Sequence, residues 1–194
     1  LHLSLRRQRQ MCIRDSLNTI LFVSWLLPFK LFALPEMIIG EANIDPGIHL
    51  IFECGIKDDI APNTVFLAEN ETDVHIEMLA NWSENAPKGS LPGGHVPYLK
   101  VSLIVINEIT NTSATVNLDP HLNLSDNLHY AQNIKLPGKI DERYTLKFII
   151  EPPINGSLGM HYDWRQQVGE TISPGGTFTF VGLNLSKIAN AMRR

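Results

Sequence analysis

The order of apolar and polar residues predicts antiparallel β-strands over most of the chain. Residues 98–109 alternate between apolar and polar side chains, and residues 144–150 repeat this period of two, as expected for strands with one buried face. Shorter runs rich in β-branched and aromatic residues occupy 49–53, 73–79, 113–118 and 177–181. Only residues 185–192 favour a helix. The pattern predicts an all-β fold, an immunoglobulin-like antiparallel β-sandwich forming a single domain.

The first 42 residues have the pattern of a secretory signal peptide. Basic residues in 6–14 precede a largely apolar run over 17–34, and the small residues Gly40 and Ala42 follow. We predict cleavage after Ala42, with Ala33 as the second choice, and an exported domain over 43–194. A permanent membrane anchor is the alternative, although Pro28 and Lys30 interrupt the apolar run. Residues 1–16 resemble translated sequencing-adapter read-through, which would place the native start downstream.

The charge distribution argues against nucleic acid as a partner. Residues 43–194 hold 11 basic and 17 acidic side chains, with no basic cluster that could neutralise phosphates. This segment contains a single cysteine, Cys54, so an intramolecular disulfide is excluded there. Cys54 ends an apolar run, which predicts a buried strand residue rather than a metal ligand or a nucleophile.

Histidines and acidic residues are the candidate metal ligands. His75 and Glu77 are two residues apart in a predicted strand, so both side chains project from one face, while their neighbours face the core. An imidazole beside a carboxylate is half of a site for a borderline transition metal. A turn-rich segment over 119–130 adds His121, Asp126 and His129, and His161 follows in a later loop. Spacing alone does not join these residues into one site.

Four segments of the sequence resemble the periplasmic iron-transport protein family, small bacterial exported proteins that assist high-affinity Fe2+ uptake. They are 73–77, 96–99, 126–130, and 148–153 followed by His161, and the likeness runs in order from about Ala42 to the C-terminus. The resemblance implies an immunoglobulin-like sandwich, a homodimer, and a metal site near the subunit interface that takes copper and handles iron. Carried over, the ligands are His75, Glu77, His129 and His161, with Asp126 nearby.

One ligand of the family pattern, a methionine, has no clear counterpart. Around its position the sequence has Pro120 and His121, and we expect His121 to replace the thioether. Imidazole in place of sulfur should favour Cu(II), iron or Zn(II) over Cu(I). His49 and His95 match no ligand position and are predicted to be exposed to solvent.

The sequence therefore predicts a periplasmic metal-binding protein that works with an inner-membrane iron permease. The metals expected are copper (Cu2+) and iron, with Mn2+ and Zn2+ as alternatives. The protein is not expected to be an enzyme. A cupro-oxidase or ferroxidase is the first alternative function. A metal-free adhesive or carbohydrate-binding sandwich, in which sequons such as the one at Asn70 would matter, is the second. A copper-scavenging protein without an iron role is the third.

Overall fold

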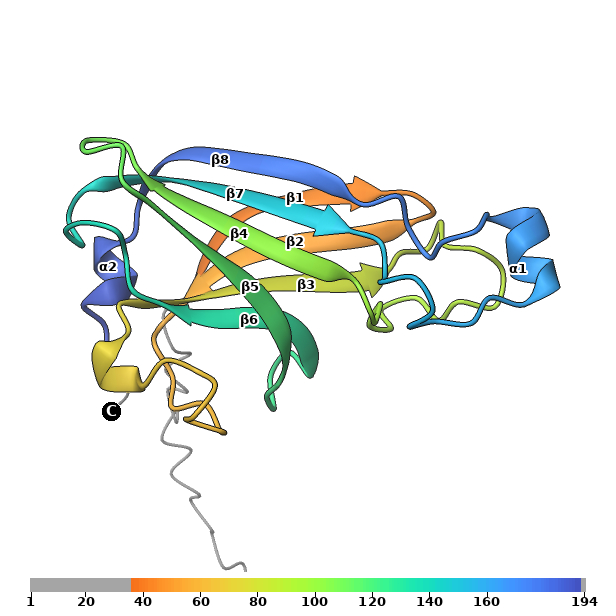
Figure 1. Ribbon diagram of the computed structural model, residues 1–194, viewed down its shortest axis with the longest axis horizontal. Helices are drawn as coiled ribbons and strands as arrows, with labels where there is room; N and C mark the ends of the chain where they lie inside the picture. Colours follow the sequence, from red (N-terminus) through yellow and green to blue (C-terminus); the bar gives the residue numbers. More distant parts are fainter. Residues whose placement is uncertain (1–35, 193–194) are drawn as a thin grey trace, which may run out of the picture. The chain divides into compact units, whose positions relative to one another are not determined.

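Eight antiparallel strands make up almost all of the regular structure in the computed structural model, which describes residues 36–192 (Figure 1). The strands are β1 (Met37–Ile44), β2 (Ile48–Gly55), β3 (Val74–Trp82), β4 (Lys100–Asn107), β5 (Ser113–Leu122), β6 (Leu128–Ile134), β7 (Arg143–Glu151) and β8 (Gly176–Asn184). Two short helices, α1 (Tyr162–Gln167) and α2 (Ser186–Ala189), and a 3-10 turn (Glu69–Glu71) complete this part of the chain. The all-β antiparallel prediction is confirmed.

The strands follow the order β1-β2-β3-β6-β5-β4-β7-β8, and β5 links the two halves of the sandwich. Its first part, up to Leu118, pairs with β4, whereas Asp119 to Leu122 pairs with β6. Pro120, which has no backbone N–H to donate, lies where the strand changes partner. This crossover places the end of β5 beside β6 and, through β6, beside β3.

An aromatic cluster fills the core between the two halves. The ring of Phe52 on β2 lies 4.6 Å from that of Phe148 on β7, and 5.4 and 5.1 Å from those of Phe178 and Phe180 on β8, measured between centroids. A Cβ atom on Gly40 of β1 would clash with the Phe180 ring, so this position requires glycine. The close approach lets the edge strands β1 and β8 meet, which nearly closes the sandwich.

The first strand, β1, begins upstream of the predicted cleavage site. Residues 37–42 belong to β1 and pair with β2, so cleavage after Ala42 would remove most of an edge strand. Cleavage after Ala33 would leave β1 intact. The rest of the predicted leader, including the adapter-like residues 1–16, lies outside the described residues. No helix within 36–192 is both long enough and apolar enough to cross a membrane.

Several local predictions need correction. Residues 119–122 and 128–130, predicted to be loop, are strand, and α1 was not predicted. The helix expected over 185–192 is limited to α2. His95 is not solvent-exposed: it packs on Tyr130 with 5.2 Å between ring centroids, and its Nδ1 is buried. His49 is partly covered and contacts Glu41. Cys54 is fully buried, as predicted.

Candidate metal centre

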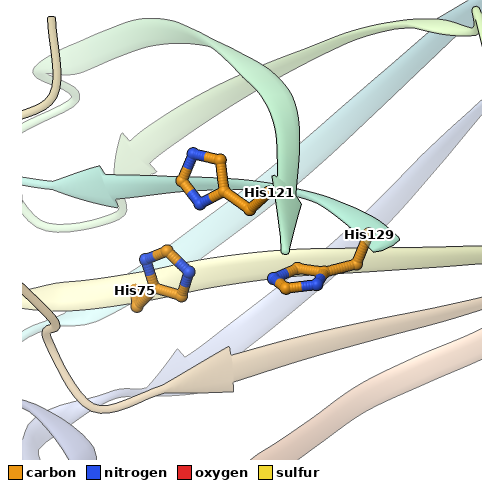
Figure 2. Close-up of side chains that lie close together, drawn as sticks. All are labelled: His75, His121 and His129. Atoms are coloured by element: carbon orange, nitrogen blue, oxygen red, sulfur yellow. The ribbon is translucent and has the colours of Figure 1, made fainter. Parts of the chain in front are cut away.

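Three histidines from three neighbouring strands converge on one buried space. His75 lies on β3, His121 on β5 and His129 on β6, and their rings point toward one another (Figure 2). One ring nitrogen from each residue can be chosen so that all three atoms lie within 4.8 Å of one another. The residues are 5, 8 and 1% exposed, respectively. Three imidazoles at this separation are a donor set for a borderline transition metal such as Cu(II) or Zn(II).

A hydrogen bond to Asn133 on β6 fixes the orientation of His75. The Asn133 Nδ2 group donates to the carbonyl oxygens of Asp58 and Leu67, at 2.7 and 2.8 Å, which identifies Oδ1 as the acceptor end of the amide. His75 Nδ1 lies 2.9 Å from this Oδ1 and must donate to it. The proton of neutral His75 is therefore on Nδ1, and the lone pair on Nε2 is free for a metal.

His129 is oriented in the same way by a backbone carbonyl. Its Nδ1 lies 3.0 Å from the carbonyl oxygen of Asn127, which can only accept a hydrogen bond. In the neutral ring of His129, the lone pair is therefore on Nε2. Asn127 has φ 63° in the turn between β5 and β6, a backbone region that asparagine tolerates better than most residues. The turn geometry thus places an acceptor behind the second ligand.

The third histidine has an unsatisfied nitrogen. His121 Nε2 is buried and has no hydrogen-bond partner within 36–192, although buried polar atoms in folded proteins are nearly always paired. A metal ion that accepts the lone pair of this nitrogen would satisfy it. The ring of Phe66 packs edge-on against His121, with centroids 4.7 Å apart, and covers it. The orphaned nitrogen and the two oriented histidines fit a metal centre.

Glu77 supplies a carboxylate beside the histidines. Its Oε1 lies 3.7 Å from His75 Nε2 and its Oε2 lies 3.5 Å from His129 Nε2, which is longer than a good hydrogen bond. The pKa of Glu77 is raised to about 8, mainly by burial and to a smaller extent by the negative charges of Asp126, Glu36, Glu53 and Asp58. In the metal-free protein at neutral pH, Glu77 is therefore mainly protonated.

His75 and His121 are held neutral. Burial is the main reason that the pKa of His75 and that of His121 fall to about 4, and the proximity of His129 makes a smaller contribution to both. Neutral imidazole is the form that binds metal, so these two rings need to lose no proton at pH 7. Of His75, His121 and Glu77, it is Glu77 that must lose a proton before a cation can bind at neutral pH.

A cavity of about 460 Å³ gives access to the centre. Glu36, Asp58 and Asp59 line it together with His75, Glu77, His121 and His129. Acidic side chains at an opening attract cations and repel anions. No methionine or cysteine is among the described residues that line this cavity, so the donors around it are nitrogen and oxygen.

The structure brings together four of the six predicted ligands: His75, Glu77, His121 and His129. Asp126 lies near enough to raise the pKa of Glu77, but its Oδ2 accepts hydrogen bonds from Asn123 and Ser125 in its own turn. His161 does not join the cluster within one chain. It precedes α1 and lines a separate apolar cavity with Trp82 and Trp164.

Sequence reasoning missed the residues that orient the ligands. Asn133, Asn127 and Phe66 lie 58, two and 55 positions from the histidines they contact. No periodicity marks them, because an asparagine that accepts from a histidine has no fixed spacing from it. The one available signal is the even spacing of His129 and Asn133 in β6, which places both polar side chains on the same face of the strand.

The sequence matches the model of the family described as Fe2+ transport protein over residues 33–181. The chain belongs to this family. UPF0423 proteins of Brucella abortus (strain 2308) and Brucella suis biovar 1 are each 27% identical over 142 residues, which is 72% of this chain and 76% of theirs.

Solved structures of similar proteins have the same fold. FetP of uropathogenic Escherichia coli strain F11, recombinantly expressed in the periplasm of E. coli, is 26% identical with a TM-score of 0.64, and the match covers 78% of this chain and 100% of that one. A copper-bound variant of Campylobacter jejuni P19 is 24% identical with a TM-score of 0.65. The match covers 76% of this chain and 96% of that one. The chain thus matches nearly the whole length of both solved structures.

Proposed function

We propose that this member of the Fe2+ transport protein family binds copper at His75, His121 and His129, with Glu77 as an oxygen ligand. The observation that carries the proposal is the buried, unpartnered Nε2 of His121 beside two histidines whose Nε2 lone pairs are free. The copper bound by a variant of C. jejuni P19 supports the choice of metal.

The donor set favours Cu(II) over Cu(I). Imidazole and carboxylate are borderline to hard ligands, whereas Cu(I) prefers thiolate and thioether sulfur. Zn(II) and Mn(II) are the competitors that the same ligands admit, and the Irving–Williams order places Cu(II) above both.

The role we propose is a metal carrier in iron uptake rather than an enzyme. The family description supports the link to Fe2+ transport, and the acidic opening lined by Glu36, Asp58 and Asp59 favours the approach of a cation. We propose that the protein acts in the periplasm and delivers iron to an inner-membrane permease. E. coli FetP has been produced by recombinant expression in the periplasm, which is in keeping with this compartment.

We also propose a homodimer. His161 is exposed and lies apart from the cluster of its own chain, so it is accessible to the metal centre of a second copy. Sedimentation analysis should then give twice the mass of the monomer. His161→Ala should weaken copper binding only in the dimer, and a monomer with full copper affinity would contradict this part of the proposal.

Copper binding is tested by titrating the purified protein with Cu(II) in competition with a chromophoric chelator. We expect one ion per chain, and loss of that ion in His75→Ala. His49→Ala is the matched control, because His49 lies on β2 and contacts Glu41 and Asn43 instead of the cluster. Equal copper binding by His75→Ala and the unaltered protein would contradict the proposal. Oxygen uptake on addition of Fe(II) to the copper-loaded protein would indicate a ferroxidase rather than a carrier.

A further inference from the structure

One buried amide connects the metal centre to the loop that covers it. Asn133 is 3% exposed, and its Oδ1 accepts from His75 Nδ1. The same side chain donates to the carbonyl oxygen of Asp58, at one end of the loop over 56–68, and to that of Leu67, at the other end. A single residue thus joins a ligand to both ends of one loop.

That loop forms a wall of the metal cavity. Asp58, Asp59 and Phe66 line the cavity, and Phe66 packs edge-on against His121. The position of the loop therefore determines how closely Phe66 covers His121 and where Asp58 and Asp59 lie at the opening of the cavity. Because Asn133 holds both ends of the loop, a change in its hydrogen bonds reaches His121 as well as His75.

We propose that Asn133 is a positioning residue that presents His75 Nε2 to the metal and couples metal loading to closure of the 56–68 loop, an inference that rests on the proposed copper function. Metal bound at Nε2 withdraws electron density from the imidazole and makes Nδ1–H a stronger donor to Asn133. Copper therefore tightens the network that holds the loop. By linkage, the closed loop increases copper affinity by the same factor.

Two substitutions of Asn133 distinguish its role as acceptor for His75 from its role as donor to the two ends of the loop. Asn133→Asp keeps an oxygen acceptor for His75 Nδ1–H and for the backbone N–H of Asp58, but loses the donors to the carbonyl oxygens of Asp58 and Leu67. Asn133→Leu loses both functions. Asn117→Leu is the matched control, since Asn117 is an asparagine on β5 whose side chain bonds to Ser102 at the surface.

The first measurement is copper affinity with pulsed EPR of the bound Cu(II). Asn133→Leu should lower the affinity about 10- to 100-fold, as expected for loss of a hydrogen bond behind a ligand. It should also change the remote-nitrogen signal of one imidazole, which general destabilisation would not do. Asn133→Asp and Asn117→Leu should stay within a few-fold of the unaltered protein. An unchanged affinity and nitrogen signal in Asn133→Leu would overturn the proposal.

The second measurement is hydrogen exchange at the Val65 amide, which donates to the carbonyl oxygen of Pro62 within the loop. In the unaltered protein, copper should slow this exchange several-fold. In Asn133→Asp the exchange should be faster without copper, and copper should no longer slow it. Unaltered exchange in Asn133→Asp would overturn the proposal even if Asn133→Leu fails to fold. If the unaltered protein binds no copper, the proposed function fails, and the copper-free exchange still tests whether Asn133 holds the loop.

Discussion

The Nδ1 atom of His129 lies 3.0 Å from the backbone carbonyl oxygen of Asn127, whose own φ is 63°. The carbonyl that orients a ligand is therefore held by a left-handed turn residue. Since most residues adopt this conformation at a cost, the identity of residue 127 affects the metal centre through the backbone alone.

Replacement of Asn127 should affect stability and copper binding together. Asn127→Ala should lower the free energy of unfolding by about 1 kcal/mol, because alanine tolerates a positive φ less well than asparagine. It should also weaken copper binding, since the carbonyl moves relative to His129. Asn127→Gly should largely preserve both properties. Chemical denaturation and copper titration measure the two effects.

A matched control is Asn111, which has φ 57° in the turn between β4 and β5, away from the cluster. Asn111→Ala should destabilise the protein to a similar extent while copper affinity stays unchanged. Weakened copper binding in Asn111→Ala would show that the effect at Asn127 is one of general stability.

Copper binding at pH 7 should release about one proton per ion, and Glu77 should be its source. The folded pKa of Glu77 is about 8, so the carboxyl is mostly protonated at pH 7 and must ionise to bind a cation. His75 and His121, with pKa values of about 4, have no proton to release there. Calorimetry in buffers of different ionisation enthalpy counts the protons.

Because Glu77 must lose a proton to bind copper, copper affinity should depend on pH. As the pH rises from 6 to above 8, fewer protons compete, so copper affinity should increase and proton release should fall toward zero. Glu77→Gln should release almost no proton at pH 7. A full proton released by Glu77→Gln would place the titrating group elsewhere.

Replacement of His121 should change the preference for the oxidation state of copper. His121→Met introduces a thioether and should shift binding toward Cu(I), whereas His121→Ala should weaken Cu(II) binding without unfolding the protein. Competition titrations with Cu(I)- and Cu(II)-selective chelators measure both. An unchanged Cu(II) affinity and nitrogen hyperfine structure in His121→Ala would show that His121 is not a ligand.

Cys54 should be a packing residue without a role at the metal. It is fully buried, and burial raises the pKa of its thiol far above the usual range, so it stays protonated. Cys54→Ala should cost about 1 kcal/mol of stability, as a small loss of core volume, and should leave copper stoichiometry unchanged. Loss of the metal in this variant would identify the thiol as a ligand.

The sequence predicted those strands whose side chains alternate strictly. In β4 and β7 every second residue is buried, so the period of two is visible along the chain. In β6 the polar residues His129 and Asn133 are buried on one face, while Tyr130 and Ile134 are buried on the other, so burial does not follow the alternation of polar and apolar residues. The residues that make the site are thus the ones that obscure the fold in this region.

The convergence of the ligands was beyond local sequence reasoning. His75 and Glu77 share a strand face because they are two residues apart, which the sequence does show. His121 and His129 face each other because β5 and β6 form a hairpin in that register, and they reach His75 because β6 pairs with β3. This strand order depends on contacts between segments far apart in the chain, which local patterns do not show. Only the family resemblance joined these residues into one predicted site.

The most direct test of the metal centre is EPR of Cu(II) bound to the protein and to three single variants, His75→Gln, His121→Gln and His129→Gln. Each variant should lose one coupled imidazole nitrogen relative to the unaltered protein, and the triple variant should bind no copper at this site. The same nitrogen couplings in all three single variants would contradict a copper centre built from His75, His121 and His129.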